Sequence, residues 1–291
     1  MKTENEYLSI EINEEGGCLK SIFDKKRNQE LLYQPHPDSW KGQDVFIFPF
    51  IARLKDQTYT IDGKEYSMKN HGLLRYMKAT LSLEKNKDIK ATFESNEETL
   101  KQYPFLFRAY GLYHLEKNTL EVSYHIFNLS DRDMPFEVGA HPAFRLPGVR
   151  KEEEFDISGN VIRFRKRMHL RRIAQEETAS FNLGEVKYRH TDSIPLSRKL
   201  FQEIPTLILK AEDIDQVTLE KKDGTKLVIH KGNIPYLAIW SDKAYGDYVA
   251  IEPWDGLPDY VDAKKEMSEK KAISILKPKK EYTFRYQMDV L

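Results

Sequence analysis

The chain has 291 residues, of which 40% are hydrophobic, so it is long enough and apolar enough to bury a sizeable core. Its 46 Lys and Arg residues are balanced by 46 Asp and Glu residues, which argues against nucleic acid as a partner, although a local basic patch remains open. The single cysteine, Cys18, excludes a disulfide framework within one chain and is typical of a reducing compartment.

The sequence also argues against a membrane partner. The first residues lack the apolar stretch of a secretory signal. The longest uncharged apolar run, VFIFPFIA at residues 45–52, is far shorter than the roughly 18 residues that a bilayer requires. We therefore expect a cytoplasmic protein.

Hydrophobic and polar residues alternate with a period of two in many short runs, which predicts β-strands. In chain order, the clearest runs cover residues 7–12, 120–126, 206–211, 216–220, 226–230, 236–240 and 282–290. Turn signals such as KKDGTK and KGNIP separate them. Many short strands at nearly regular spacing predict an all-β sandwich or barrel.

Helix signals are sparse, and only short helices are predicted, at residues 193–204 and 262–272. The charged cluster RKEEEFD at residues 150–156 is predicted to be a solvated loop. The sequence contains no repeat, low-complexity tract or Pro/Gly-rich linker, so we expect residues 1–291 to form a single domain.

Two titratable residues stand directly before prolines at the ends of predicted strands. His141 precedes Pro142 in FEVGAHPAF, and Glu252 precedes Pro253 in YVAIEPWDG. A proline cannot donate a ladder hydrogen bond, and it pushes the preceding residue into an extended conformation. Strand pairing should therefore stop at both places. This predicts that both side chains lie at the edge or mouth of a sheet, where a concave site can form.

Two further polar residues interrupt the pattern. His71 stands beside Gly72 in NHGLLR, and Arg53 interrupts the apolar run that begins at residue 45. An arginine at that place should pair or face a cavity, because burying an uncompensated charge costs several kcal/mol. Taken singly, each residue also has a plainer interpretation: His141 as a turn residue, His71 as a loop residue and Arg53 as a salt-bridge partner.

The remaining motifs exclude several kinds of chemistry. His125 is predicted on a solvated strand face and His36 in a Pro-rich turn, and no two histidines show metal-ligand spacing, so a zinc site is not expected. The sequence has no Gly-x-Ser-x-Gly elbow, phosphate-binding Gly-rich loop or Rossmann signature. What remains is a carboxylate, two imidazoles and a guanidinium, which suit general acid–base catalysis on a polar, uncharged ligand.

The segments FPFIARL, NHGLLR, GAHPAFRLP, YLAIWS and IEPWDGLPD, in this order, resemble the aldose 1-epimerase (galactose mutarotase) family, and most closely its LacX-like branch. GAHPAF and IEPWDGLPD are the most specific of them. The resemblance implies a large antiparallel β-sandwich with a few short helices. It also implies an isomerase that interconverts the α and β anomers of a free aldohexose such as galactose and needs no cofactor. We expect a monomer or a homodimer.

The resemblance also implies a role for each residue. Glu252 matches the base that takes the proton from the anomeric hydroxyl, and His141 matches the acid that protonates the ring oxygen. His71 and Arg53 match positions that hold sugar hydroxyls or the ring oxygen.

Two tryptophans lie beside the motifs, and two short segments depart from the family pattern. Trp240 and Trp254 lie beside the motifs and are interpreted either as an apolar platform for the sugar or as core residues. Residues 41–43 read KGQ where the hexose-6-phosphate branch carries Arg-Gly-Gly, which disfavours a phosphosugar, although Lys41 or Arg75 could meet a phosphate. Residues 202–205 read QEIP where the family often has an Asp, and Glu203 is a candidate substitute.

Three functions remain open. An epimerase requires one base and one acid, and the presence of both Glu252 and His141 favours it. A non-catalytic sugar-binding or regulatory protein would not need both residues. A glycoside hydrolase or lyase would need a second carboxylate, for which Asp255 and Asp259 are the nearby candidates, although both fall in a predicted turn.

Overall fold

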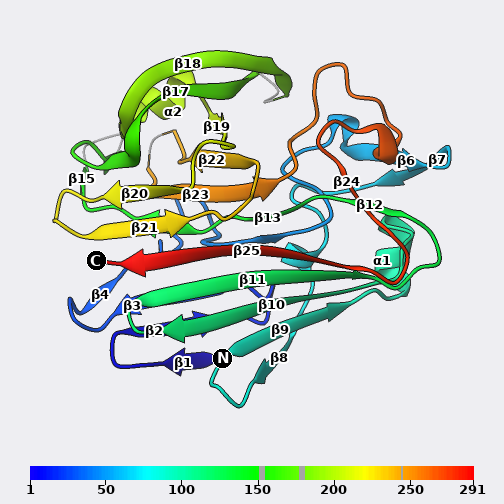
Figure 1. Ribbon diagram of the computed structural model, residues 1–291, viewed down its shortest axis with the longest axis horizontal. Helices are drawn as coiled ribbons and strands as arrows, with labels where there is room; N and C mark the ends of the chain where they lie inside the picture. The colour runs from blue at the N-terminus through cyan, green and yellow to red at the C-terminus, as the bar shows by residue number, and fades with distance from the viewer. Residues whose placement is uncertain (151–154, 177–180, 244) are drawn as a thin grey trace.

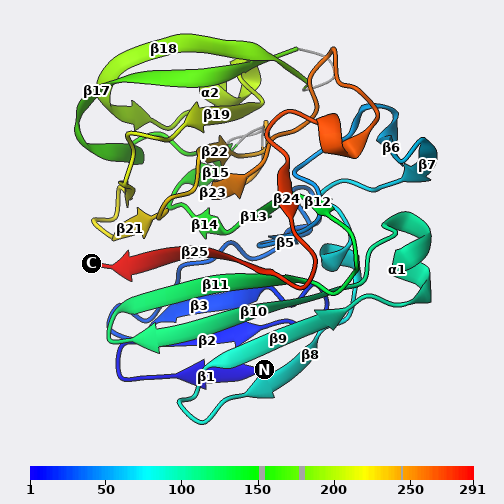
Figure 2. The same cartoon turned by 45° about the vertical axis from the view of Figure 1, so that its right-hand side comes forward.

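The computed structural model describes residues 1–150, 155–176, 181–243 and 245–291. About 51% of the chain is strand and 8% helix, and the large sheets are antiparallel, so the predicted all-β sandwich with a few short helices is confirmed. The first sheet has four strands: β1 (Lys2–Glu4), β2 (Leu8–Ile12), β3 (Leu19–Asp24) and β4 (Gln29–Glu30). It lies against the neighbouring strands of a second, much larger sheet (Figures 1 and 2).

The large sheet contains fifteen strands and provides most of the scaffold. Two of them lie beside the main path: β14 (Ala143–Arg145), which pairs with β23, and β18 (Asn182–Pro195), which pairs with β17. The main path runs in the order β5 (Phe46–Ile47), β13 (Val138–Ala140), β23 (Tyr248–Asp255), β22 (Tyr236–Trp240), β19 (Thr206–Lys210), β17 (Val161–Gln175), β20 (Gln216–Glu220), β21 (Lys226–His230), β25 (Glu281–Val290), β11 (Thr119–Asn128), β10 (Phe107–Glu116), β9 (Ile89–Glu94) and β8 (Thr80–Leu83).

The remaining elements are short. Three two-stranded pairs join β12 (Met134–Phe136) with β24 (Ser274–Leu276), β15 (Val149–Arg150) with β16 (Phe155–Asp156), and β6 (Thr58–Ile61) with β7 (Lys64–Ser67). The helices are α1 (Glu97–Gln102), α2 (Arg198–Glu203) and the 3₁₀ turns η1 (Lys55–Gln57), η2 (Leu74–Tyr76) and η3 (Met267–Glu269). None of the helices in the described ranges is long and apolar enough to cross a bilayer.

All seven predicted strand runs are strands, from β2 to β25. Alternation places Leu120, Val122 and Tyr124 of β11 in the main core, each no more than 1% exposed. The opposite face of β11 is less exposed than predicted, because the His125 ring stacks on Tyr110 with ring centroids 4.4 Å apart. His125 Nδ1 also lies 2.6 Å from a carboxylate oxygen of Glu281, so His125 is not simply solvated. His36 lies in an exposed loop, as predicted.

The helix predictions are correct in part. Within residues 193–204 the chain forms α2, which Ser197 caps by accepting the Leu200 N–H at 3.2 Å. Within residues 262–272 only the single turn η3 forms. Helix α1 was not predicted, although a capping box of Asn96 and Thr99 marks its start. The predicted loop at residues 150–156 falls largely outside the described residues.

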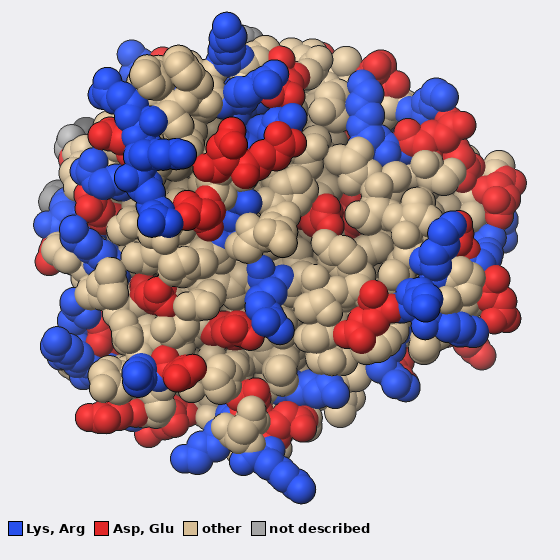
Figure 3. All heavy atoms as spheres, viewed as in Figure 1, with Lys and Arg blue, Asp and Glu red and all other residues tan. Residues whose placement is uncertain are grey.

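The face shown in Figure 3 carries both basic and acidic side chains, and the basic ones gather over β17 and β18. Strand β17 carries six Lys and Arg residues and no acidic residue. At least three of the six pair with acidic residues in the described ranges: Arg163 with Glu220, Arg165 with Asp215, and Arg171 with Glu185. The local basic patch that the sequence left open therefore exists, but several of its cations have acidic partners.

Candidate active site

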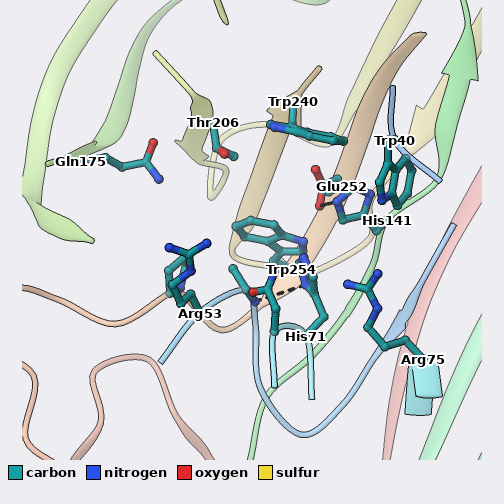
Figure 4. A pocket seen from close by; sticks show the side chains of 13 residues that line it. Trp40, Arg53, His71, Arg75, His141, Gln175, Thr206, Trp240, Glu252 and Trp254 are labelled. Atoms are coloured by element: carbon teal, nitrogen blue, oxygen red, sulfur yellow. Dashed lines mark hydrogen bonds and ion pairs between the residues drawn. The ribbon is translucent and has the colours of Figure 1, made fainter. Parts of the chain in front are cut away.

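A pocket of about 380 Å³ contains all six residues predicted to act on the substrate, namely Glu252, His141, His71, Arg53, Trp240 and Trp254 (Figure 4). Segments from distant parts of the sequence build it. The other lining residues are Trp40, Ala52, Asn70, Arg75, Gln175, Thr206 and Pro258. A volume of this size is in the range that holds a small molecule.

The strand register determines which side chains of the large sheet face the pocket. Glu252 pairs with Ala238 of β22, and Trp240 pairs with Thr206 of β19. Because side chains alternate between faces, Glu252, Trp254 and Trp240 all project to the same side.

Glu252 does not end its strand, and this corrects the sequence prediction. Strand β23 continues to Asp255, and Pro253 lies inside it, opposite Leu237 of β22. The reason lies on the other side of β23, where β13 pairs with residues 254–255 and β14 pairs with residues 248–250. The Ile251 N–H donates to Pro142 on that side at 3.2 Å, so by alternation the nitrogen of Pro253 points there too, into the gap in pairing.

The interruption between β13 and β14 is where His141 lies. The prediction that pairing stops at Pro142 is therefore correct. Gly139 makes room for the site, because a Cβ there would lie 2.8 Å from the Trp254 ring. His141 thus leaves the ladder directly opposite Glu252.

The imidazole and the carboxylate meet in a dry environment. His141 Nε2 lies 3.2 Å from Glu252 Oε2, and the two side chains are 8% and 1% exposed. Three buried polar atoms at this place, His141 Nδ1, Glu252 Oε2 and Trp254 Nε1, form no hydrogen bond of regular geometry among the described residues, although Oε2 is the atom that faces His141 Nε2. Buried polar atoms normally have partners, so this cluster is a place for a polar ligand.

Burial controls the protonation of the pair. It lowers the pKa of His141 to about 3, and it raises the pKa of Glu252 well above its usual value. The Trp254 indole opposes the second shift, whereas the nearby buried carboxyl of Asp44 adds to it. Both pKa shifts disfavour an isolated charge on His141 or on Glu252. The pair is therefore most stable with one proton in total and no net charge.

His71 is held by reciprocal hydrogen bonds with Ala52. The Ala52 N–H donates to His71 Nδ1 at 3.2 Å, and the His71 N–H donates to the Ala52 carbonyl at 2.8 Å. Both residues have positive φ, 49° for Ala52 and 63° for His71, an unfavourable conformation for residues with a Cβ. Burial, followed by the charges of His141 and Arg75, lowers the pKa of His71 well below its usual value. A neutral ring that accepts at Nδ1 carries its proton on Nε2.

Two arginines approach the pocket from different sides in Figure 4. Arg53 is exposed, and Arg75, from η2, is partly buried. Neither guanidinium forms an ion pair with any carboxylate in the described ranges; Arg75 instead lies over the Tyr76 ring at 5.1 Å. Within the described ranges Arg53 therefore faces the cavity and not a carboxylate.

Aromatic rings enclose the histidine. The Trp40 ring lies 4.7 Å from the His141 ring and 5.5 Å from the Trp240 ring, centroid to centroid. His71 lies 5.3 Å from His141 in an edge-on arrangement. Trp40 was not identified from the sequence. Its signal was its position in QPHPDSWKG, directly before the segment that leads into β5.

The candidate substitute Glu203 is not in the pocket. It lies exposed at the end of α2, 3.7 Å from Lys199. Thr206, three residues later on β19, lines the pocket instead. Lys41 is exposed and does not line the pocket. The described residues contain no group of three His, Cys, Asp or Glu side chains that could hold a metal ion.

The sequence model of the aldose 1-epimerase family matches residues 1–288. The chain belongs to the aldose 1-epimerase family. Within this family it is similar to protein LacX of Lactococcus lactis subsp. lactis, with 24% identity over 284 residues that cover 96% of this chain and 95% of that protein. The resemblance seen in the motifs is therefore confirmed.

Solved structures agree with this assignment. The galactose mutarotase related enzyme from Lactobacillus acidophilus is 28% identical, with a TM-score of 0.92 over 100% of this chain and 97% of that one. The galactose mutarotase-like protein from Lactobacillus casei is 26% identical, with a TM-score of 0.91 over 100% and 99%. The mutarotase-like fold thus extends over the whole of this aldose 1-epimerase family member.

Proposed function

We propose that this protein interconverts the α and β anomers of a free aldohexose by acid–base ring opening and closure. One observation carries the proposal: His141 and Glu252 face each other at 3.2 Å on the floor of a pocket of sugar size. A carboxylate and an imidazole are the two groups that this reaction needs.

The proton transfers balance when His141 and Glu252 together carry one titratable proton. Glu252, as carboxylate, takes the proton of the anomeric hydroxyl, while His141, as imidazolium, protonates the ring oxygen and the C1–O5 bond breaks. After rotation about C1–C2, His141 takes the proton back from the C5 hydroxyl as its oxygen attacks C1. Glu252 then returns its proton to the former carbonyl oxygen. The pair holds one titratable proton throughout, and burial favours the open-chain stage, in which that proton is on Glu252 and His141 is neutral.

The surrounding residues suit a sugar ring. The Nε2–H of neutral His71 is a donor for a hydroxyl or the ring oxygen, and Arg53 supplies further donors at the pocket mouth. Trp240 and Trp254 offer apolar faces to the C–H side of the ring. These contacts support binding of a polar, uncharged ligand and need no cofactor.

A hexose 6-phosphate is a second candidate substrate, and one observation favours it. Arg53 and Arg75 bring two guanidinium groups to a pocket in which Glu252 is the one carboxylate among the described lining residues. An arginine without a carboxylate partner is well suited to bind a phosphate. The exposed position of Lys41 outside the pocket gives this candidate no additional cation.

Polarimetry of freshly dissolved α-D-galactose and α-D-glucose, with and without the protein, tests the proposal. We expect faster approach to the equilibrium rotation. Calorimetric titration with the same sugars and their 6-phosphates distinguishes the candidates, since at least tenfold tighter binding of a 6-phosphate would select the second one. Binding of a free sugar without any acceleration would instead identify a sugar-binding protein that does not catalyse.

A further inference from the structure

A buried ion pair lies behind the pocket wall and takes no part in the steps above. Lys270 Nζ donates to Glu137 Oε1 at 2.5 Å, and the two side chains are 4% and 0% exposed. Lys270 also donates to the carbonyl of Leu257. Because an uncompensated buried charge is unfavourable, each partner depends on the other.

Glu137 holds two chain segments that lead into the pocket. Its Oε2 accepts the Ile51 N–H at 2.9 Å, two residues before Arg53. Its Oε1 accepts the Leu257 N–H at 3.1 Å, in the loop that follows β23. At Gly256, where φ is 139°, a Cβ would lie 2.6 Å from the Glu137 side chain, so the loop approaches the carboxylate closely because no side chain intervenes.

Asp259 extends the same network to the other side of Arg53. Its N–H donates to the Arg53 carbonyl at 3.2 Å, and its Oδ2 accepts the Lys55 N–H at 2.8 Å. Its Oδ1 lies 3.8 Å from Lys270 Nζ. The backbone groups of residues 51, 53 and 55 are thus hydrogen-bonded to Glu137 or Asp259, which form one buried charged cluster with Lys270.

The same two segments also support Trp254. Ile51 and Leu257 belong with Trp254 to one buried apolar cluster, separate from the main core. Trp254 itself is 2% exposed and lines the pocket. A shift of either segment would therefore move a sugar-facing ring as well as a sugar-facing guanidinium.

We propose that Glu137, supported by Lys270, is a positioning residue that holds Arg53 and Trp254 in their sugar-binding places. This inference rests on the function proposed above. Glu137 does not line the pocket, so its effect must act through the residues it holds. A displacement near 1 Å at a binding group can reduce kcat/KM by roughly a hundredfold.

The variant Glu137→Gln tests the inference because it keeps the shape of the side chain. One of its two acceptor oxygens becomes an NH₂ group, so one of the two backbone N–H groups loses its acceptor. We expect KM to rise roughly ten- to a hundredfold with a much smaller change in kcat. Asp88→Asn is the matched control, because Asp88 is also buried and lies 2.6 Å from the ring nitrogen Nδ1 of His114, but does not line the pocket.

A double-mutant cycle with Arg53→Ala separates positioning from general destabilisation. If Glu137 acts through Arg53 and Trp254, Glu137→Gln should raise KM clearly less in the Arg53→Ala background than in the wild type, the remaining effect being the part that acts through Trp254. Multiplying effects would overturn the inference. If Glu137→Gln does not fold, Asp259→Ala releases the same segment at Lys55 and carries the same expectation.

A second readout does not depend on turnover. The chain has three tryptophans, so its indole N–H resonances are few, and a Trp254→Phe variant assigns the one from Trp254. We expect Glu137→Gln to shift this resonance and Asp88→Asn to leave it in place. An unshifted resonance would overturn the inference even if the wild-type protein turned over no sugar, an outcome that would count against the proposed function separately.

Discussion

Glu252 Oε2 and His141 Nε2 lie 3.2 Å apart at the interruption between β13 and β14, where β23 keeps its pairing with β22 on one side but lacks a continuous ladder on the other. The carboxylate comes from inside a central strand, and the imidazole comes from the break beside it. Strand pairing therefore holds the base rigidly. The acid sits where the backbone has left the ladder, so both reach the same point of a bound sugar.

Replacement of His141 tests the acid. We expect His141→Asn to lower kcat by roughly 10²–10⁴-fold, because a positioned acid contributes about that factor. Sugar affinity should change little, since Asn retains a hydrogen-bonding side chain. Polarimetric kcat together with calorimetric affinity checks this. A loss of affinity with kcat retained would make His141 a binding residue.

The pH dependence should show a broad plateau. Gain of a second proton by the pair is opposed by burial, which lowers the pKa of His141 to about 3. Loss of the shared proton is opposed as well, because burial raises the pKa of Glu252 well above its usual value. The pair keeps one proton between these limits, so kcat/KM should fall in strong acid, where the pair gains a second proton, and again above the raised pKa of Glu252, where the pair loses its proton. An acid limb near 6.5, the usual pKa of histidine, would contradict this.

Much of the fold was predictable because strand faces leave a mark in the sequence. The alternation in β2 and β11 follows from one face packing on the core, and all seven predicted runs are strands. The position of His141 was predictable because Pro142 cannot donate to a ladder. The same argument failed for Glu252, because whether a proline is tolerated depends on what lies beside the strand, and the gap next to Pro253 is a tertiary feature.

Other parts of the site could not be predicted from local sequence. Thr206 and Gln175 reach the pocket through the register of β19 and the length of β17, which no local pattern specifies. The reciprocal bonds between Ala52 and His71 join residues 19 positions apart and require positive φ at both. The roles assigned to His141 and Glu252 came from the family resemblance, since spacing alone placed them without a function.

We expect the fold to require a glycine at position 72, next to the pocket residue His71. With φ at 78°, a Cβ there would lie 2.2 Å from the Phe48 carbonyl oxygen, which accepts the Leu73 N–H at 2.7 Å. Gly63 is a matched control with φ of 76° and no atom within 4 Å of its Cβ position. We expect Gly63→Ala to cost about 1–2 kcal/mol for the left-handed conformation, and Gly72→Ala to cost about 1–3 kcal/mol more for the clash.

Urea unfolding of the wild type and both variants measures these free energies of unfolding. Equal losses in the two variants would show that the backbone conformation alone, and not the close approach of Gly72 to Phe48, determines the requirement for glycine.

The most direct test of the account is the mutarotation rate of α-D-galactose and α-D-glucose with wild type and Glu252→Gln, at sugar concentrations that saturate both proteins. We expect the wild type to accelerate the change in optical rotation. The variant should bind sugar with similar affinity and turn it over roughly 10²–10⁴-fold more slowly, because its amide cannot accept the anomeric proton. A variant with near wild-type turnover would contradict the assignment of Glu252 as the base.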